Sequence, residues 1–522
     1  MPRIIGCAVA TPQGSLDATI HALRAAHGQP GELAGELIGL LHALSLEALA
    51  GLRPDLVVLA TTKGDCDRWC TALLAEGGGL EGGPAWLARQ LGERLAAPAF
   101  AVSSACASSP LAVGVAARWL LAGRAQRVLV VGGDRSGAFV RDGFSALRAI
   151  DPVGCRPFDA DRVGLRLGEA AAALLLARDD DAGSGPFLQG WGASMDANHL
   201  TGPSRDGAGL ALACTRALER ASSGPPALII AHGTGTRYND DSESLAYARA
   251  CPGVPLTALK GLIGHSLGAC GLVELAIAQE FHRRGRCAGV VGLTRQGCAG
   301  AVEVLPPGSH DLAPGAILSA NAGFGGLNGA VVIGDRPAPA RAVARHECTT
   351  VVEIMPDCWM RRRAGGSPER TPWSEPGDGG ALPRLGAREV TGSADASWGR
   401  MDLACRALVA LGHLLGPLPR ECALVLCSES GCAATDRLYE LERRAGHADP
   451  QRFAYTLPST PIGETSIRLK LQGPGLVLLG ADEQQARQVA EDLLADCPAV
   501  VLAWVEADRP PHRAYAELWQ VR

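Results

Sequence analysis

The thiol whose surroundings most favour chemistry lies in the motif SSACASS, residues 103–109. Cys106 follows an apolar run at 99–102 and precedes a helix-forming stretch that begins at Pro110. Small residues on both sides permit a tight strand-to-helix turn and the close approach of another molecule. A helix N-terminus lowers the pKa of a nearby thiol and favours the thiolate. The motif is typical of a nucleophile, but a buried core cysteine between small residues fits it equally well.

Three glycine-rich motifs further along the chain supply partners for such a thiol. His232 begins HGTGT, directly after an apolar run. Lys260 and His265 lie in KGLIGHSLGACGLVE, which ends at Glu274, and NAGFGGLNG occupies residues 321–329. Strand ends are where α/β folds commonly build sites, and a cysteine combined with histidines elsewhere is the general signature of a nucleophilic thiol site. The four motifs together favour a nucleophilic Cys106 over four unrelated structural features.

The elements that must position these residues alternate along the first part of the chain. Helical stretches such as 112–121 and 210–221 separate compact apolar runs, which lie at 56–59, 127–131, 227–231 and 330–333. Alternation of this kind predicts an α/β architecture in which helices cover both faces of the sheets.

The order of SSACASS, PFDADR, HGTGT, KGLIGHSLGA and GFGGLNG resembles that of the β-ketoacyl-acyl-carrier-protein synthases, which have the thiolase fold. The resemblance covers about residues 1–340 and is specific, because five motifs occur in the right order at compatible spacings. It implies a layered α/β/α/β/α fold. It also implies an acyltransferase that binds no cofactor of its own, because phosphopantetheine arrives on an acyl carrier protein.

The resemblance implies a role for each residue of the central motifs. Cys106 matches the acylated nucleophile, and His232 and His265 match the paired histidines of decarboxylation and condensation. Lys260 matches the lysine that supports the second histidine, and Glu274 matches the carboxylate of the same motif.

Further roles are implied for the flanking residues. Asp240 and Glu243, in YNDDSE, match acidic residues that pair with the lysine in relatives. Thr234 and Thr236 match threonines that bind the phosphopantetheine arm by hydrogen bonds. Phe324 matches the gating phenylalanine beside the oxyanion hole, which the backbone N–H groups of the nucleophile and of this phenylalanine would form.

The chemistry of decarboxylative condensation agrees with these roles. Loss of carbon dioxide from a malonyl thioester builds negative charge on an enolate, which two imidazole N–H donors stabilise without a metal. The enolate then attacks the acyl-cysteine and extends the chain, as fatty acid, polyene or polyketide synthesis requires. Two alternatives stay open: a non-elongating partner similar to a chain-length factor, and an acyltransferase that uses another acceptor.

The composition changes after Gly334. Residues 336–346 are typical of a linker, and residues 361–384, rich in Gly, Pro, Arg and Ser, predict a long exposed loop. Residues 423–431 echo 56–64, and residues 474–508 align without a gap on 100–134, with Gly480 opposite Cys106. We therefore expect a catalytic domain at 1–340, followed at 341–522 by a linker and a truncated, non-catalytic α/β half-domain of similar topology. Generic α/β similarity is the alternative explanation.

A second copy suggests how the chain assembles. Thiolase-fold enzymes generally dimerise by pairing one strand with its copy in the partner. We expect this strand to follow the nucleophile helix, at 127–131, with 500–505 as its degenerate counterpart in the same chain. Covering an exposed edge in this way would give an intramolecular pseudo-dimer. The alternatives are an ordinary homodimer, or a heterodimer with a ketosynthase-like subunit.

Bulk properties exclude several classes of function. The net charge of −5 over 522 residues gives no footprint for nucleic acid. No apolar run reaches the length of about 18 residues that a membrane span needs. The N-terminus lacks the features of a signal peptide, so we expect a cytoplasmic protein. The 17 cysteines are scattered, and most are expected to be buried small hydrophobic residues.

Overall fold

The computed structural model describes residues 1–26, 28–178, 185–337, 345–507 and 512–521. Its N-terminal unit contains two layers of strands, here called the first and second sheets, which are joined at one end by a single antiparallel pair, Arg3 with Phe187. The first sheet has the strand order β3–β2–β4–β5–β1, with β3, β2 and β4 parallel and the last two strands antiparallel to their neighbours. These strands are β1 (Arg3–Ala10), β2 (Leu56–Ala60), β3 (Ala99–Val102), β4 (Arg127–Gly133) and β5 (Ala171–Ala177).

The second sheet has the order β6–β13–β12–β7–β8–β10. Its strands are β6 (Phe187–Met195), β7 (Leu228–Ala231), β8 (Pro255–Ala258), β10 (Glu303–Val304), β12 (Ile317–Gly323) and β13 (Leu327–Gly334). The strands of the two sheets that carry the central motifs are buried along most of their length.

Two central helices lie between the sheets. They are α5 (Ser108–Leu121) and α10 (Cys270–Arg284), and each contacts strands of both sheets. Both are buried over nearly their whole circumference, because a helix between two sheets has no solvent-facing side. On the outer faces, α2 (Leu37–Leu49) and α4 (Pro84–Leu95) cover the first sheet, and α7 (Ala208–Ala221) covers the second. The predicted α/β/α/β/α layering is confirmed.

The C-terminal unit repeats the first sheet only. Its strands have the order β18–β17–β19–β20–β14, with the same parallel and antiparallel pairings as β3–β2–β4–β5–β1. They are β14 (His346–Ile354), β17 (Ala423–Ser428), β18 (Gly475–Leu479), β19 (Ala499–Glu506) and β20 (Arg513–Val521). The structure therefore contains the truncated half-domain of similar topology that the internal comparison predicts.

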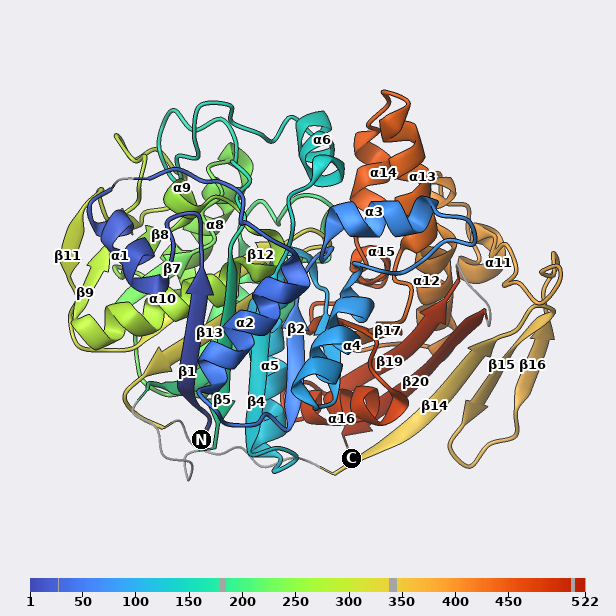
Figure 1. The fold of residues 1–522 in the computed structure, drawn as a ribbon. Helices are drawn as coiled ribbons and strands as arrows, with labels where there is room; N and C mark the ends of the chain where they lie inside the picture. The colour runs from blue at the N-terminus through green and yellow to red at the C-terminus, as the bar shows by residue number, and fades with distance from the viewer. Residues whose placement is uncertain (27, 179–184, 338–344, 508–511, 522) are drawn as a thin grey trace.

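A hairpin extends this second sheet beyond β14. It consists of β15 (Cys358–Arg363) and β16 (Glu369–Pro372), and in Figure 1 it projects on the side away from the N-terminal unit. The prediction of a loop throughout 361–384 is wrong for its first part. Cross-strand ion pairs from Arg361 and Arg363 to Glu369 compensate for the lack of an apolar period.

The two units join through β3 and β18, which pair antiparallel with Leu478 opposite Val102 and Leu479 opposite Ala101. The predicted pairing of 127–131 with 500–505 is wrong. β4 lies between β2 and β5, and β19 lies between β17 and β20, so neither strand has a free edge. The strand before the nucleophile helix is the one at the sheet edge, and the C-terminal unit covers that edge. Figure 1 shows this unit, in orange and red, against the flank of the first sheet.

The proposed domain division between residues 340 and 341 lies outside the described residues, as does most of the expected linker. Within the described part of the chain, no helix is both long and apolar enough to cross a membrane.

Candidate active site

Cys106 lies in a tight turn between β3 and α5. The turn is the short helix η1 (Ala105–Ala107), and Ala105 adopts the left-handed conformation, with φ of 51°. The hydroxyl of Ser108 donates to the carbonyl of Ala105 at 2.6 Å and accepts from the N–H of Ser104 at 2.9 Å. A left-handed alanine is strained, so this local network and the surrounding packing must hold the turn.

Three reactive side chains meet at this turn. The Sγ of Cys106 and one ring nitrogen from each of His232 and His265 lie within 4.8 Å of one another. His232 follows β7, and His265 lies in the loop after α9 (Lys260–Ile263). The two imidazole rings are nearly perpendicular, with centroids 5.2 Å apart. The structure thus brings together the three residues that the sequence motifs single out.

Hydrogen bonds assign the tautomer of each imidazole. The Nδ1 of His265 accepts from the N–H of Leu267 at 3.1 Å. The Nδ1 of His232 lies 3.2 Å from the amide nitrogen of Asn321, which donates to it and also to Glu274 at 2.7 Å. Because both Nδ1 atoms accept, each neutral ring carries its proton on Nε2 and can donate from there.

Electrostatics keep both rings neutral. Burial lowers the pKa of His232 and of His265 well below the usual 6.5, and the nearby ammonium of Lys260 lowers both further. At neutral pH the site therefore offers two neutral N–H donors rather than imidazolium ions.

Lys260 forms a fully buried ion pair with Glu274, with 2.6 Å between Nζ and Oε1. Burial alone would lower the pKa of Lys260, but the adjacent Cys270 and Glu274 outweigh this and raise its pKa above the usual value. The ammonium therefore stays charged beside the histidines.

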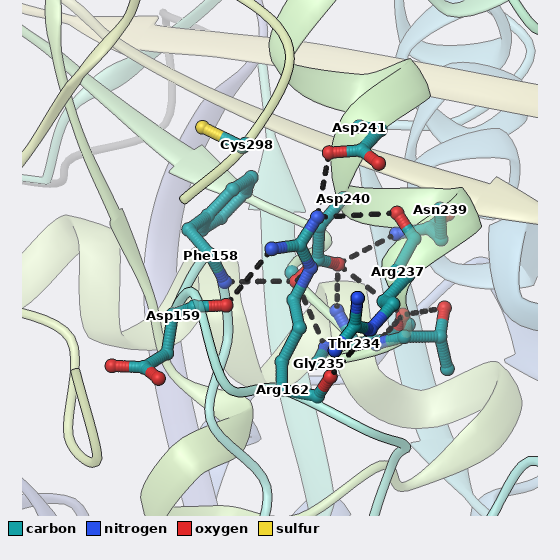
Figure 2. Close-up of polar contacts among 12 residues, drawn as sticks. Phe158, Asp159, Arg162, Thr234, Gly235, Arg237, Asn239, Asp240, Asp241 and Cys298 are labelled. Carbon is teal, nitrogen blue, oxygen red and sulfur yellow. Dashed lines mark hydrogen bonds and ion pairs between the residues drawn. The ribbon is translucent and has the colours of Figure 1, made fainter. Parts of the chain in front are cut away.

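Asp240 and Glu243 do not bind Lys260, contrary to the prediction. Asp240 accepts from the backbone N–H groups of Phe158, Thr234 and Gly235 at 2.8 to 3.2 Å. Figure 2 shows Asp240 and the guanidinium of Arg162 beside the HGTGT turn. Asp240 and Glu243 do not pair with Lys260 because their carboxylates accept from buried backbone N–H groups of the HGTGT turn. Glu274 is the carboxylate that accepts from Lys260.

Glu243 has the same function at the start of the HGTGT turn. It accepts from the N–H of Gly233 at 2.8 Å, from the N–H of His232, and from the hydroxyl of Tyr247 at 2.6 Å. Burial raises the pKa of Glu243 to about 7. The carboxylate thus fixes the backbone that carries His232.

An open cleft leads to the three reactive side chains. Thr234 and Thr236 line it, with their hydroxyls 3.0 Å apart. Phe324 lines it beside Cys106, and a Cβ added to the preceding Gly323 would lie only 3.1 Å from the backbone nitrogen of Cys106. The backbone at 323–324 therefore runs directly past the nucleophile turn.

A second, apolar pocket, with a cavity volume of about 20 Å³, begins at Cys106 and Phe324. Its walls include residues of both units: Thr62, Lys63, Val140, Phe144, Phe453, Thr456 and Leu457. The last three belong to α14 (Pro450–Tyr455) and the turn after it. Sequence reasoning missed these wall residues, because nothing in the local pattern at 453–457 indicates a contact with a motif near residue 106.

The environment of the thiol has opposing effects on its pKa. Burial raises the pKa of Cys106 to about 12, although the nearby Lys260 lowers it. Burial by residues distant in sequence thus opposes the activation expected from the helix N-terminus, and that activation stays a prediction.

Family models for the β-ketoacyl synthase N-terminal domain and C-terminal domain match residues 9–182 and 187–285, respectively. The chain belongs to the β-ketoacyl synthase family. It is 32% identical over 263 residues to the tetracenomycin polyketide synthase ketoacyl synthase alpha subunit of Streptomyces glaucescens, covering 47% of this chain and 62% of that one. It is also 32% identical over 268 residues to the chloroplastic 3-oxoacyl-[acyl-carrier-protein] synthase II of Arabidopsis thaliana, covering 48% and 49%. The chain thus spans less than two thirds of the length of these relatives.

Solved structures show the same fold for this β-ketoacyl synthase. A β-ketoacyl synthase from Burkholderia phymatum is 24% identical, with a TM-score of 0.60 over 64% of this chain and 99% of that one. The PfaC keto synthase–chain length factor is 15% identical, with a TM-score of 0.75 over 100% of this chain and 78% of that one. The second likeness extends the shared fold to the C-terminal unit.

Asp134 is a residue of this synthase that sequence reasoning missed. Its carboxylate accepts from the hydroxyl of Thr61, from the N–H groups of Lys63 and Gly64, and from the N–H of Gly268, all within 2.9 Å. It thereby ties the end of β2 to the loop that carries His265. The signal in the sequence is an acidic residue directly after the apolar run 127–133.

The triad of Cys106, His232 and His265 also has the ligand types of a zinc site. In the acyl transfer that the sequence motifs predict, Cys106 carries the acyl group and cannot bind a metal ion at the same time. The absence of a metal from this site therefore stays a prediction.

Proposed function

We propose that the chain is a β-ketoacyl-acyl-carrier-protein synthase. It would transfer an acyl group from a carrier protein to Cys106 and condense it with malonyl-carrier protein, in fatty acid, polyene or polyketide synthesis. The observation that carries this proposal is the meeting of Cys106 with two neutral imidazoles, between an open cleft and an apolar pocket. The names of the relatives agree with it.

In the first half-reaction, the sulfur of Cys106 attacks the carbonyl carbon of the acyl thioester. Both Nδ1 atoms already accept hydrogen bonds and both Nε2 atoms carry protons, so neither imidazole takes the thiol proton. The proton passes instead to the departing pantetheine sulfur as the new carbon–sulfur bond forms. The backbone N–H groups of Cys106 and Phe324 would stabilise the tetrahedral oxyanion. The pantetheine sulfur then leaves as a thiol with that proton, and both imidazoles stay neutral throughout.

In the second half-reaction, the malonyl group loses carbon dioxide. The Nε2–H groups of His232 and His265 would stabilise the enolate oxygen that results. The enolate carbon attacks the acyl-cysteine carbonyl, the tetrahedral intermediate collapses, and the sulfur of Cys106 leaves as a thiolate that takes a proton from water. Lys260, paired with Glu274, disfavours protonation of the rings and so preserves both donors.

Three residues would serve the carrier arm. Thr234 and Thr236 lie where hydroxyls can bind the amides of phosphopantetheine, and Phe324 would gate the passage between cleft and pocket. The cofactor would thus arrive on the acyl carrier protein. Reduced thiols are typical of the cytoplasm, where we place the reaction.

We further propose that residues 1–340 are catalytic and that 341–522 form a non-catalytic domain similar to a chain-length factor. In the comparison of the two sequence segments, Gly480 falls opposite Cys106. The β3–β18 pairing supports an intramolecular pseudo-dimer over a homodimer or a heterodimer with a separate ketosynthase-like subunit.

Intact-protein mass spectrometry tests the proposal. The wild type should gain one acyl group from acyl-carrier protein, and Cys106→Ala should gain none. Addition of malonyl-carrier protein should then release carbon dioxide and an extended product. A wild type without any adduct would refute the enzyme and leave a non-elongating partner. An adduct without carbon dioxide release would favour an acyltransferase with another acceptor.

A further inference from the structure

Lys63 lies between two cavities at the junction of the units. On one side is the apolar pocket that begins at Cys106. On the other is a small cavity of about 10 Å³, which Lys63 lines together with Trp69, Asp436 and residues of both units. The two pockets are thus consecutive along the junction, and the side chain of Lys63 borders both.

An ion pair across the junction fixes this side chain. The Nζ of Lys63 donates to both carboxylate oxygens of Asp436, at 2.6 and 2.5 Å. The indole N–H of Trp69 donates to the same carboxylate at 2.9 Å, and the Sγ of Cys432 lies 3.5 Å from Nζ. The backbone N–H of Lys63 is held in turn by Asp134 at 2.7 Å.

The pair is almost completely buried, with 4% of the Lys63 side chain and 1% of the Asp436 side chain exposed. Burial alone would lower the pKa of Lys63, but the carboxylate of Asp436 outweighs this and holds it above the usual value. The lysine is therefore charged at neutral pH. An acyl chain that entered this space would have to separate two opposite charges where no water can solvate them.

An ion pair is thus a more rigid wall than an apolar side chain. Phe453 and Leu457, which line the same pocket, can change rotamer at small cost, whereas the ammonium of Lys63 loses its partner if it moves. The walls of the acyl pocket are mainly apolar between Cys106 and Lys63, and the pocket ends at the charged ammonium of Lys63.

We propose that the Lys63–Asp436 ion pair closes the acyl pocket of Cys106 and so restricts the enzyme to acyl chains that end before the pair. This inference rests on the proposed function. It names the determinant of acyl length within that site: one side chain from each unit, neither of which takes part in the chemistry. Removal of the pair should join the two pockets and admit longer chains.

The test measures which acyl groups reach Cys106. Full-length protein is incubated with saturated acyl-carrier proteins of increasing chain length, and the acylated fraction is read by intact-protein mass spectrometry. Wild type should show a cut-off in length. Lys63→Ala/Asp436→Ala should move it by about four methylene groups, the length of the lysine stem. The first chain beyond the wild-type cut-off should then react about tenfold faster or more.

Two controls separate charge from bulk and from general loosening. Lys63→Met/Asp436→Leu removes both charges but keeps most of the volume, and it should move the cut-off by a smaller amount. Arg89→Ala/Glu429→Ala removes an exposed ion pair at the same junction and should leave the cut-off unchanged.

The outcomes are distinct. An unchanged cut-off in both double variants of the buried pair, with short chains still accepted, overturns the inference. If the double alanine variant does not fold, the Met/Leu variant decides, because apolar replacement of a buried pair is generally tolerated. Failure of the wild type to accept any acyl group contradicts the proposed function instead.

Discussion

The ion pairs of Asp496 offer a quantitative test of how the C-terminal unit is docked. Asp496 lies after α16 (Glu483–Leu493) and pairs with Arg118, at 2.6 Å, and with Arg220, both from the N-terminal unit. The three side chains are only 13%, 10% and 6% exposed. Both guanidinium groups also lie over the ring of Trp191. Burial lowers the pKa of Arg118 to about 10, which reflects how little solvent reaches it.

Asp496→Ala removes the carboxylate from both arginines but leaves their charges buried. Loss of one partner of a buried pair costs about 3–5 kcal/mol. Because Trp191 still faces both guanidinium groups, we expect the lower end of this range, about 3 kcal/mol. Arg89→Ala is the matched control at the same junction. Its partner is Glu429, and the side chains are 54% and 44% exposed, so it should cost less than about 1 kcal/mol.

Urea unfolding followed by tryptophan fluorescence measures both effects. Asp496→Ala should lower the midpoint clearly, and Arg89→Ala should shift it little. If the two variants lose the same stability, or if Asp496→Ala loses less than about 1 kcal/mol, burial does not make this ion pair more important for stability than an exposed one.

Three further predictions concern the reactive centre. The imidazoles of His232 and His265 should stay neutral at pH 6.5 in side-chain NMR spectra. Because the pKa values of both histidines in the folded protein lie below 6.5, the unfolded chain binds more protons than the folded one as the pH falls. The free energy of unfolding should therefore decrease below pH 6.5. Titration of the two imidazoles at the usual pKa would contradict this prediction. Lys260→Met leaves Glu274 buried without its ammonium partner. It should slow the release of carbon dioxide about 100-fold, while Cys106 is still acylated. An equal loss of acylation and of decarboxylation would indicate a general disruption of the site. Ala105→Val puts a branched residue at φ of 51°, which should lower the free energy of unfolding by about 2 kcal/mol and abolish acylation of Cys106. Ala105→Gly should behave as wild type. Normal acylation of the valine variant would refute the role of the turn.

The meeting of Cys106, His232 and His265 could be predicted because each lies directly after a strand or a glycine-rich turn. In a layered α/β fold such turns gather at one side of the sheets, so the sequence order of the motifs suffices. The layers follow from the same alternation of short apolar runs and helices. Both predictions depend only on features within about ten residues of each motif.

The partner of Lys260 and the pKa of Cys106 depend on longer-range packing. Three carboxylates, Glu274, Asp240 and Glu243, lie near Lys260 in sequence, and only the orientation of α10 decides which of them reaches its Nζ. Burial of the thiol likewise comes from elements far from the SSACASS motif, which the local helix-terminus argument omits.

The edge strand could not be read from the sequence either. Alternating strands and helices predict a parallel sheet but not its strand order, and the order decides that β3, rather than β4, pairs with the second unit. The wall residue Phe453 depends on this pairing in turn, since it reaches the pocket only when β18 lies beside β3.

The two copies of the nucleophile helix show how a half-domain can persist without its other half. α5 lies between two sheets and is buried almost all round, whereas its counterpart α16 has one sheet, and Glu483 and Gln484 are exposed on its free face. A polar outer face replaces the contacts that a second sheet would supply. The truncated copy therefore meets its partner along its β18 edge and where α16 packs on α5.

The charges along that edge favour unlike units. The N-terminal unit supplies the cation and the C-terminal unit the anion in the pairs Lys63–Asp436, Arg89–Glu429, Arg118–Asp496, Arg124–Glu491 and Arg220–Asp496, and the reverse holds for Arg443–Asp142. In a symmetric dimer the same patch meets itself, so cations would face cations across a surface of this composition. Like charges at a buried contact disfavour that arrangement. The division of charge between the copies thus favours pairing of unlike units over self-pairing of either unit, and such a pair contains one nucleophile for its two nucleophile-type helices.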